Sequence, residues 1–109
     1  MADDNVMQLS DLTFDDAVET GVVLVDLWAP WCSPCLIQGP IVEEVARAVD
    51  GRARVAKLNV DEGQAIAARL GVQGIPTVIL FKDGEEIQRF VGVHRKDILL
   101  SAVENALEA

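Results

Sequence analysis

The stretch Trp31-Cys32-Ser33-Pro34-Cys35 decides the fold, because it contains both cysteines of the chain and joins two regular patterns. Before it, Val22–Trp28 is almost continuously apolar, which predicts a strand that is buried on both faces. After it, residues 36–49 repeat apolar side chains at helical spacing. A thiol at a helix start meets unpaired backbone N–H groups and the positive end of the helix dipole, which both favour the thiolate. A second thiol three residues later lies one turn along the same face, so the pair can form and reopen a disulfide without unfolding.

The rest of the chain predicts strands and helices in the order β-α-β-α-β-α-β-β-α. The expected strands span Val6–Leu9, Val22–Trp28, 54–60, 77–81 and 86–91, with a hairpin turn at 82–85 before the last one. The expected helices span 13–20, 34–49, 64–70 and 96–107. We therefore expect one α/β domain over residues 1–109, with a central mixed sheet of about five strands flanked by helices on both faces.

Helical periodicity also predicts which residues of the two longest helices are buried. In the helix after the cysteine motif, the expected buried stripe is Ile37, Ile41, Val42, Val45, Ala46 and Val49. In the last helix, it is Ile98, Leu99, Ala102, Val103, Ala106 and Leu107.

Composition and charge exclude several classes of protein. The chain has 109 residues, 18 acidic and 9 basic side chains and a net charge of −9, which argues against nucleic acid or an anionic membrane as the main partner. The first residues form no apolar signal core, and no apolar run approaches membrane-spanning length. Together with two neighbouring thiols and no others, these features predict a protein of the reducing cytoplasm.

The two cysteines have a redox interpretation, a structural one and a metal-binding one. A purely structural disulfide would close a loop so short that its stabilisation is only about 2 kcal/mol before strain is subtracted. A structural zinc site needs four ligands, whereas the chain offers Cys32, Cys35 and one histidine, His94, far away in sequence. Redox chemistry is therefore the favoured interpretation, and no metal is expected.

The C-x-x-C spacing alone is weak evidence for any family, but several further residues of the chain strengthen it. They are the stretch from Val25 to Cys35, Pro40, Lys57, Gly74-Ile75-Pro76-Thr77, Gly84 and Gly92. On these residues the sequence resembles the thioredoxin family along essentially its whole length. The resemblance implies a thioredoxin-like fold and a protein-disulfide reductase that needs no cofactor beyond its own redox-active disulfide. It also implies that Cys32 attacks the substrate and that Cys35 resolves the mixed disulfide.

The resemblance gives Asp26 the role of proton acceptor for Cys35, with Lys57 as its modulating neighbour. The alternative is a structural carboxylate, held by a hydrogen bond or by Lys57, because a strand buried on both faces leaves no favourable place for a free charge. We also expect burial to raise the pKa of Asp26. Ser33 stands where family members usually have glycine, and Leu36 stands where many have lysine or arginine, so these residues are expected to affect the redox potential and partner choice.

The resemblance further implies a cis peptide bond before Pro76, facing the disulfide. Such a loop exposes backbone groups that can pair with an extended substrate segment. The expected groove is framed by Trp31, Pro34, Gly74, Ile75, Pro76 and Gly92. Trp28 is expected to contribute packing, and His94 is interpreted as a surface or capping residue.

The expected partners are disulfide-containing client proteins and a thioredoxin reductase, because the chain itself has no nucleotide-binding glycine motif. A monomer is expected. One rival interpretation is an oxidase or isomerase of an exported compartment, which the missing signal sequence disfavours. The other is a binding module in which the cysteines are incidental, which the presence of Asp26, Pro76 and both cysteines disfavours.

Overall fold

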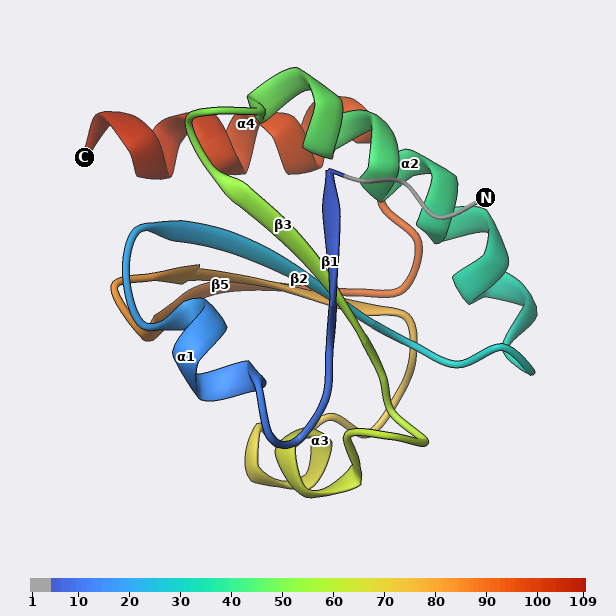
Figure 1. The fold of residues 1–109 in the computed structure, drawn as a ribbon. Coiled ribbons are helices and arrows are strands. Elements are labelled where there is room, and N and C mark those ends of the chain that lie inside the picture. The colour runs from blue at the N-terminus through green and yellow to red at the C-terminus, as the bar shows by residue number, and fades with distance from the viewer. Residues whose placement is uncertain (1–4) are drawn as a thin grey trace.

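A single five-stranded sheet lies between two layers of helices (Figure 1). The computed structural model describes residues 5–109. The strands are β1 (Val6–Leu9), β2 (Val22–Trp28), β3 (Arg54–Asn59), β4 (Thr77–Lys82) and β5 (Glu85–Val91). The helices are α1 (Phe14–Val18), α2 (Ser33–Val49), α3 (Gln64–Arg69) and α4 (Lys96–Glu108). Every predicted element is present, with ends that differ from the expected ones by at most a few residues.

The sheet is mixed, as predicted, and its strand order is β1-β3-β2-β4-β5. β1 and β2 both run parallel to β3, whereas β4 runs antiparallel to β2 and to β5. The central strand β2 is buried from Val22 to Leu27, which explains its almost continuous apolar sequence. β5 is an edge strand and is mostly exposed.

Each face of the sheet packs against its own pair of helices. In Figure 1, α2 and α4 lie above the sheet, and α1 and α3 lie below it. The upper core joins Leu24 of β2 to Val42 and Val45 of α2 and Leu99 of α4. The lower core joins the alternate residues of β2, such as Val25, to residues of α1 and α3. Because successive side chains of a strand point to opposite faces, Asp26 shares the upper face with Leu24.

The predicted buried stripes were wrong at one position in each long helix. Ile37 is 61% exposed and Ile98 is 43% exposed, whereas Gln38 is completely buried. On α2 the inward face is set by Cys35, Gln38 and Val42 and by the residues that continue this spacing. Ile37 is one residue away from this face and is therefore turned toward solvent.

The connection from β2 to α2 places the cysteine motif at the edge of the sheet where the parallel strands end. β2 ends at Trp28, and α2 begins at Ser33 with Cys32 as its N-cap residue. Ligands and reactive groups of open α/β sheets gather beyond the carboxyl ends of the strands. The hairpin turn is found at the predicted place between β4 and β5, with positive φ angles of 49° at Asp83 and 86° at Gly84.

Candidate active site

Cys32 and Cys35 form a disulfide at the N-terminus of α2. The Cys32 sulfur accepts a hydrogen bond of 3.2 Å from the backbone N–H of Cys35. One of the two sulfurs of the disulfide therefore also caps the N-terminus of α2. Pro34 occupies the first turn, where its missing N–H leaves no hydrogen bond unmade. Cys32 is 6% exposed and Cys35 is 1% exposed. Cys32 is therefore the more accessible of the two residues.

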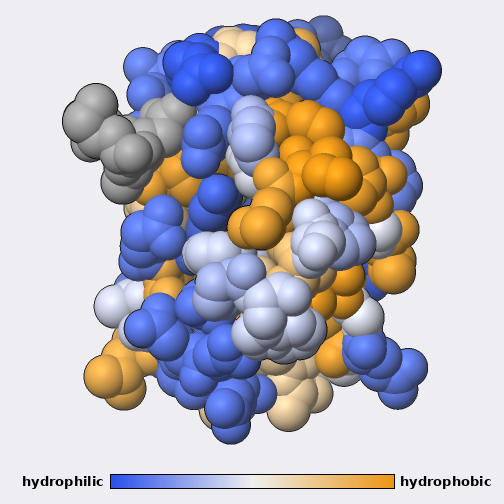
Figure 2. All heavy atoms as spheres, turned by 90° about the vertical axis from the view of Figure 1, so that its right-hand side faces the viewer, coloured by the Kyte–Doolittle hydropathy of each residue, from blue (hydrophilic) through white to orange (hydrophobic). Residues whose placement is uncertain are grey.

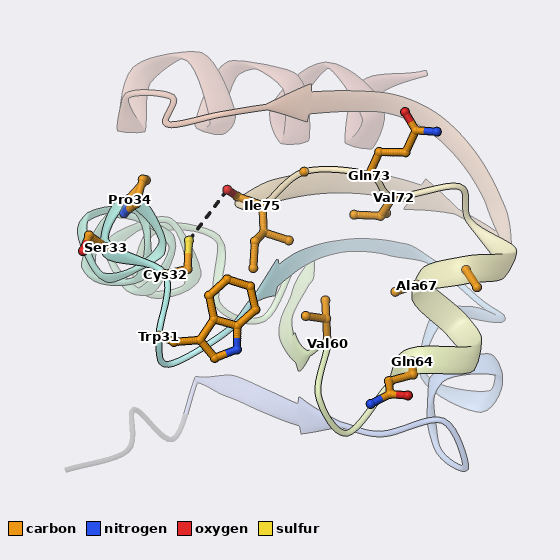
Figure 3. Close-up of a pocket in the computed structure, with 12 residues that line it drawn as sticks. Trp31, Cys32, Ser33, Pro34, Val60, Gln64, Ala67, Val72, Gln73 and Ile75 are labelled. Carbon is orange, nitrogen blue, oxygen red and sulfur yellow. Dashed lines mark hydrogen bonds between the residues drawn. The ribbon is translucent and has the colours of Figure 1, made fainter.

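A loop between α3 and β4 faces this disulfide. Its Ile75–Pro76 peptide bond is cis, as predicted, and the carbonyl oxygen of Ile75 lies 3.7 Å from the Cys32 sulfur (Figure 3). The Thr77 hydroxyl donates a hydrogen bond of 2.6 Å to the carbonyl oxygen of Gly74. The backbone N–H of Gly92 donates one of 2.8 Å to the carbonyl oxygen of Pro76. These bonds hold the loop on both sides of the cis peptide.

A groove of about 770 Å³ extends from the disulfide toward α3. Of the predicted groove residues, Trp31, Pro34, Gly74 and Ile75 line it, as does Ser33. Pro76 is buried and Gly92 is half-buried, and neither is part of this lining. The sequence interpretation missed the far wall, formed by Val60, Gln64, Ala67, Ala68, Val72 and Gln73. Figure 3 shows this wall opposite Cys32, with Trp31 between them.

At the end of the groove next to the disulfide, the apolar ring of Trp31 is exposed. The Trp31 side chain is 68% exposed, and its indole N–H donates a hydrogen bond of 3.0 Å to a carboxylate oxygen of Asp61. Figure 2 shows apolar residues gathered on the face of the molecule where α2 begins. Exposed apolar patches of this kind mark surfaces that bind other proteins.

Comparison with known proteins decides the family. The thioredoxin family model matches residues 5–105. The chain belongs to the thioredoxin family. Thioredoxins from Staphylococcus saprophyticus and Staphylococcus aureus are 44% and 42% identical to it over 102 residues, which cover 94% of this chain and 98% of each relative. A mutant thioredoxin from Halobacterium salinarum superimposes with a TM-score of 0.87 and 38% identity, covering 100% of this chain and 96% of that one.

The thioredoxin-like fold expected from the sequence is thereby confirmed. Membership of this family, together with the Cys32–Cys35 disulfide, makes the protein a thiol–disulfide oxidoreductase that reduces protein disulfides. Within residues 5–109 no helix is long and apolar enough to cross a membrane. The same residues contain no cluster of three or more side chains suited to hold a metal ion.

Asp26 lies beneath α2 in the centre of the sheet. It is 0% exposed, and within the part of the chain that the structure describes neither of its carboxylate oxygens has a hydrogen-bond partner. Burial raises the pKa of Asp26 to about 7, against the opposing charge of Lys57. The prediction of a raised pKa is confirmed.

Lys57 lies directly beside Asp26 in the sheet, since β2 and β3 pair these two residues. Its ammonium group hydrogen-bonds to Glu43 of α2 at 3.4 Å and lies 5.5 Å from the centroid of the Trp28 ring. The sequence interpretation allowed for an Asp26 carboxylate held by a hydrogen bond or by Lys57. The Lys57 ammonium group donates its hydrogen bond to Glu43 instead, so the effect of Lys57 on Asp26 is electrostatic.

The remaining predicted residues lie near the disulfide with different surroundings. Trp28 is half-buried and packs against the cluster that contains both cysteines, as expected of a packing residue. Ser33 is exposed at the first position of α2. His94 is half-buried, and its ring packs edge-on against Phe90 at a centroid distance of 5.2 Å. The sequence interpretation of a surface or capping residue is corrected: His94 is half-buried, and the N-cap residue of α4 is Arg95, with no side-chain capping hydrogen bond.

Proposed function

We propose that the protein reduces client disulfides through attack by Cys32 and resolution by Cys35. The Cys32 thiolate attacks one sulfur of the client disulfide, and the other client sulfur leaves as a thiolate. Cys35 then attacks the Cys32 sulfur, forming the Cys32–Cys35 disulfide and releasing the second client sulfur. The greater exposure of Cys32 is the observation that supports this order.

Asp26 is proposed to accept the proton of the Cys35 thiol in the resolving step. A general base works best when its pKa is close to the working pH. Burial gives Asp26 a pKa of about 7, so near neutral pH it exists in both its acidic and its basic form. Lys57 would modulate this acid–base equilibrium by its charge. Without a nearby acceptor, the buried Cys35 would have to ionise alone in a medium that disfavours charge.

The groove is the proposed binding place of the client segment. Backbone groups next to the cis peptide bond can pair with an extended segment, as in strand addition. The aromatic and aliphatic side chains of Trp31, Pro34 and Ile75 would contact its apolar residues.

An external thioredoxin reductase is the proposed source of electrons that returns the disulfide to the dithiol. We further propose that the protein acts as a monomer in the cytoplasm and carries no metal or organic cofactor. Its net charge of −9 disfavours nucleic acid and anionic membranes as partners.

Trapping of mixed disulfides tests the two cysteine roles. The Cys35→Ser variant should accumulate covalent complexes with disulfide-containing proteins through Cys32, because the resolving thiol is absent. The Cys32→Ser variant is the matched control and should accumulate none. Complexes are counted by non-reducing electrophoresis and mass spectrometry of the linked peptides. Trapping by Cys32→Ser but not by Cys35→Ser would reverse the assignment.

A further inference from the structure

Gln38 is a polar residue in the apolar interface of α2. It follows Cys35 by one helical turn and is 0% exposed. Its amide N–H donates a hydrogen bond of 3.1 Å to the carbonyl oxygen of His94. Its amide oxygen accepts one of 2.7 Å from the backbone N–H of the same residue. The nitrogen and the oxygen of the buried Gln38 amide therefore both hydrogen-bond to the backbone of His94.

His94 lies in the connection from β5 to α4, which belongs to no helix or strand. In Figure 1 this connection leaves the sheet and rises beside α2 to reach α4. Backbone N–H and C=O groups that are turned away from water destabilise a fold when they have no hydrogen-bond partner. The Gln38 amide is the hydrogen-bond partner of both the N–H and the C=O of His94. In a sheet, the backbone of a neighbouring strand would make these two hydrogen bonds.

The hydrogen bonds continue from His94 to the cis peptide. The Nδ1 atom of His94 lies 3.0 Å from the carbonyl oxygen of Gly92. The N–H of Gly92 donates to the carbonyl oxygen of Pro76 at 2.8 Å. The next backbone carbonyl before Pro76, that of Ile75, lies 3.7 Å from the Cys32 sulfur. A continuous chain of polar contacts therefore joins the helix that carries Cys35 to the loop that faces Cys32.

We propose that Gln38 is a positioning residue: it holds the 91–94 loop, and through that loop the client-binding residues 74–76, in place relative to the active-site helix. The inference rests on the proposed function, because it assumes that client segments bind beside residues 74–76. Gln38 does not touch the reacting sulfurs. It keeps the backbone groups beside Pro76 where an extended client segment can pair with them. A disulfide too small to use these backbone groups should be insensitive to Gln38.

The decisive variant is Gln38→Met, which keeps the length of the side chain and removes both hydrogen bonds. We expect the KM for a protein disulfide to rise about tenfold while kcat changes less than twofold. The rate of reduction of a small aromatic disulfide should also change less than twofold. If Gln38→Met does not fold, Gln38→Glu removes only the donor toward the His94 carbonyl and should give the same split in KM and kcat.

A loss of stability alone must not be mistaken for positioning. Val103→Ala of α4 is the matched control, because Val103 is completely buried in the same core and has no side chain that could hydrogen-bond to the 91–94 loop. It should lower the melting temperature and leave the KM for the protein disulfide unchanged. An unchanged KM in the Gln38 variant, or an equal loss of rate with both kinds of disulfide, would overturn the inference.

A variant of the groove itself separates this inference from the proposed function. Ile75→Ala shortens a side chain of the groove itself and should raise the KM for the protein disulfide. If Ile75→Ala raises the KM and Gln38→Met does not, only the role of Gln38 is wrong. If neither variant changes the KM, the proposed binding of clients beside residues 74–76 is wrong as well.

Discussion

The carboxyl group of Asp26 links the stability of the molecule to pH. Its pKa is about 7 in the folded protein and near 3.9 in an unfolded chain, because burial disfavours the charged form. Above pH 3.9 the unfolded chain releases this proton while the folded protein retains it, so the free energy of unfolding falls as pH rises toward 7. The full effect above pH 7 is on the order of 4 kcal/mol.

Replacement of Asp26 by alanine should therefore stabilise the protein at neutral and alkaline pH and have little benefit near pH 4. Thermal melts of both proteins across pH measure the difference. The opposite result, a variant that is less stable at pH 8, would show that the carboxylate is a structural partner of Lys57.

The same substitution should slow turnover, because Cys35 loses its proposed proton acceptor. We expect a loss of roughly 10²-fold in the resolving step, the lower end of the range for general base catalysis. Reductase-coupled reduction of a protein disulfide measures turnover, and release from a preformed mixed disulfide isolates the resolving step. An unchanged rate of release in Asp26→Ala would remove Asp26 from the mechanism.

Ser33 should tune the redox potential rather than the rate. Within residues 5–109 its exposed hydroxyl makes no hydrogen bond in the disulfide form, so a hydrogen bond to the Cys32 thiolate would stabilise only the reduced protein. Ser33→Gly should then shift the potential in the reducing direction by no more than about 30 mV, which corresponds to about 1.4 kcal/mol. Equilibration with a glutathione buffer measures the shift. A shift in the oxidising direction would refute the hydrogen bond.

Sequence reasoning at the scale of single residues succeeded where a residue type conflicts with its surroundings. An acid inside an apolar strand predicted the raised pKa of Asp26. The cis peptide bond before Pro76 was predicted by the resemblance to the thioredoxin family. Sequence reasoning failed for Gln38 and for the contact of Lys57 with Glu43, because these depend on which segments pack together. The spacing of Cys35, Gln38 and Val42 along one helix face was the signal that could have identified the buried amide.

The short helix α3 depends on a glycine at its N-cap. A Cβ atom at Gly63 would lie 2.7 Å from Cγ of the fully buried Leu58 and closer still to its Cδ1. Gly63→Ala should therefore destabilise the protein by about 1–3 kcal/mol, the usual effect of overpacking a core. Gly74→Ala is the control, because a Cβ there meets nothing within 4 Å. Urea unfolding measures both, and equal stabilities would contradict the steric argument.

The types and order of the elements were predictable because each has a clear local signal. Val22–Trp28 is almost entirely apolar, and Asp83-Gly84 has the sequence of a tight hairpin turn. Which face of each helix is buried was harder to predict, because Ile37 and Ile98 are apolar yet lie outside the buried stripes. Apolar character alone could not identify the buried face, because both residues lie next to positions that are buried.

The whole molecule brings together residues that the sequence places far apart. The sheet order β1-β3-β2-β4-β5 puts the end of β2 beside the loop before β4, so that Cys32 faces Ile75. The resemblance to the thioredoxin family predicted that the loop containing Ile75 and Pro76 faces the disulfide. The wall of the groove on α3 was not predicted, because it consists of small and polar residues such as Ala67 and Gln64 that carry no motif.

The equilibrium potential of the Cys32–Cys35 couple is the measurement that tests reduction of protein disulfides most directly. The protein is equilibrated with reduced and oxidised glutathione at pH 7, and the fraction of disulfide is read from the mass of the alkylated protein. We predict a potential more negative than about −180 mV, the value typical of disulfide isomerases. A potential at or above about −180 mV, toward the roughly −120 mV of strong protein oxidants, would contradict a reductant.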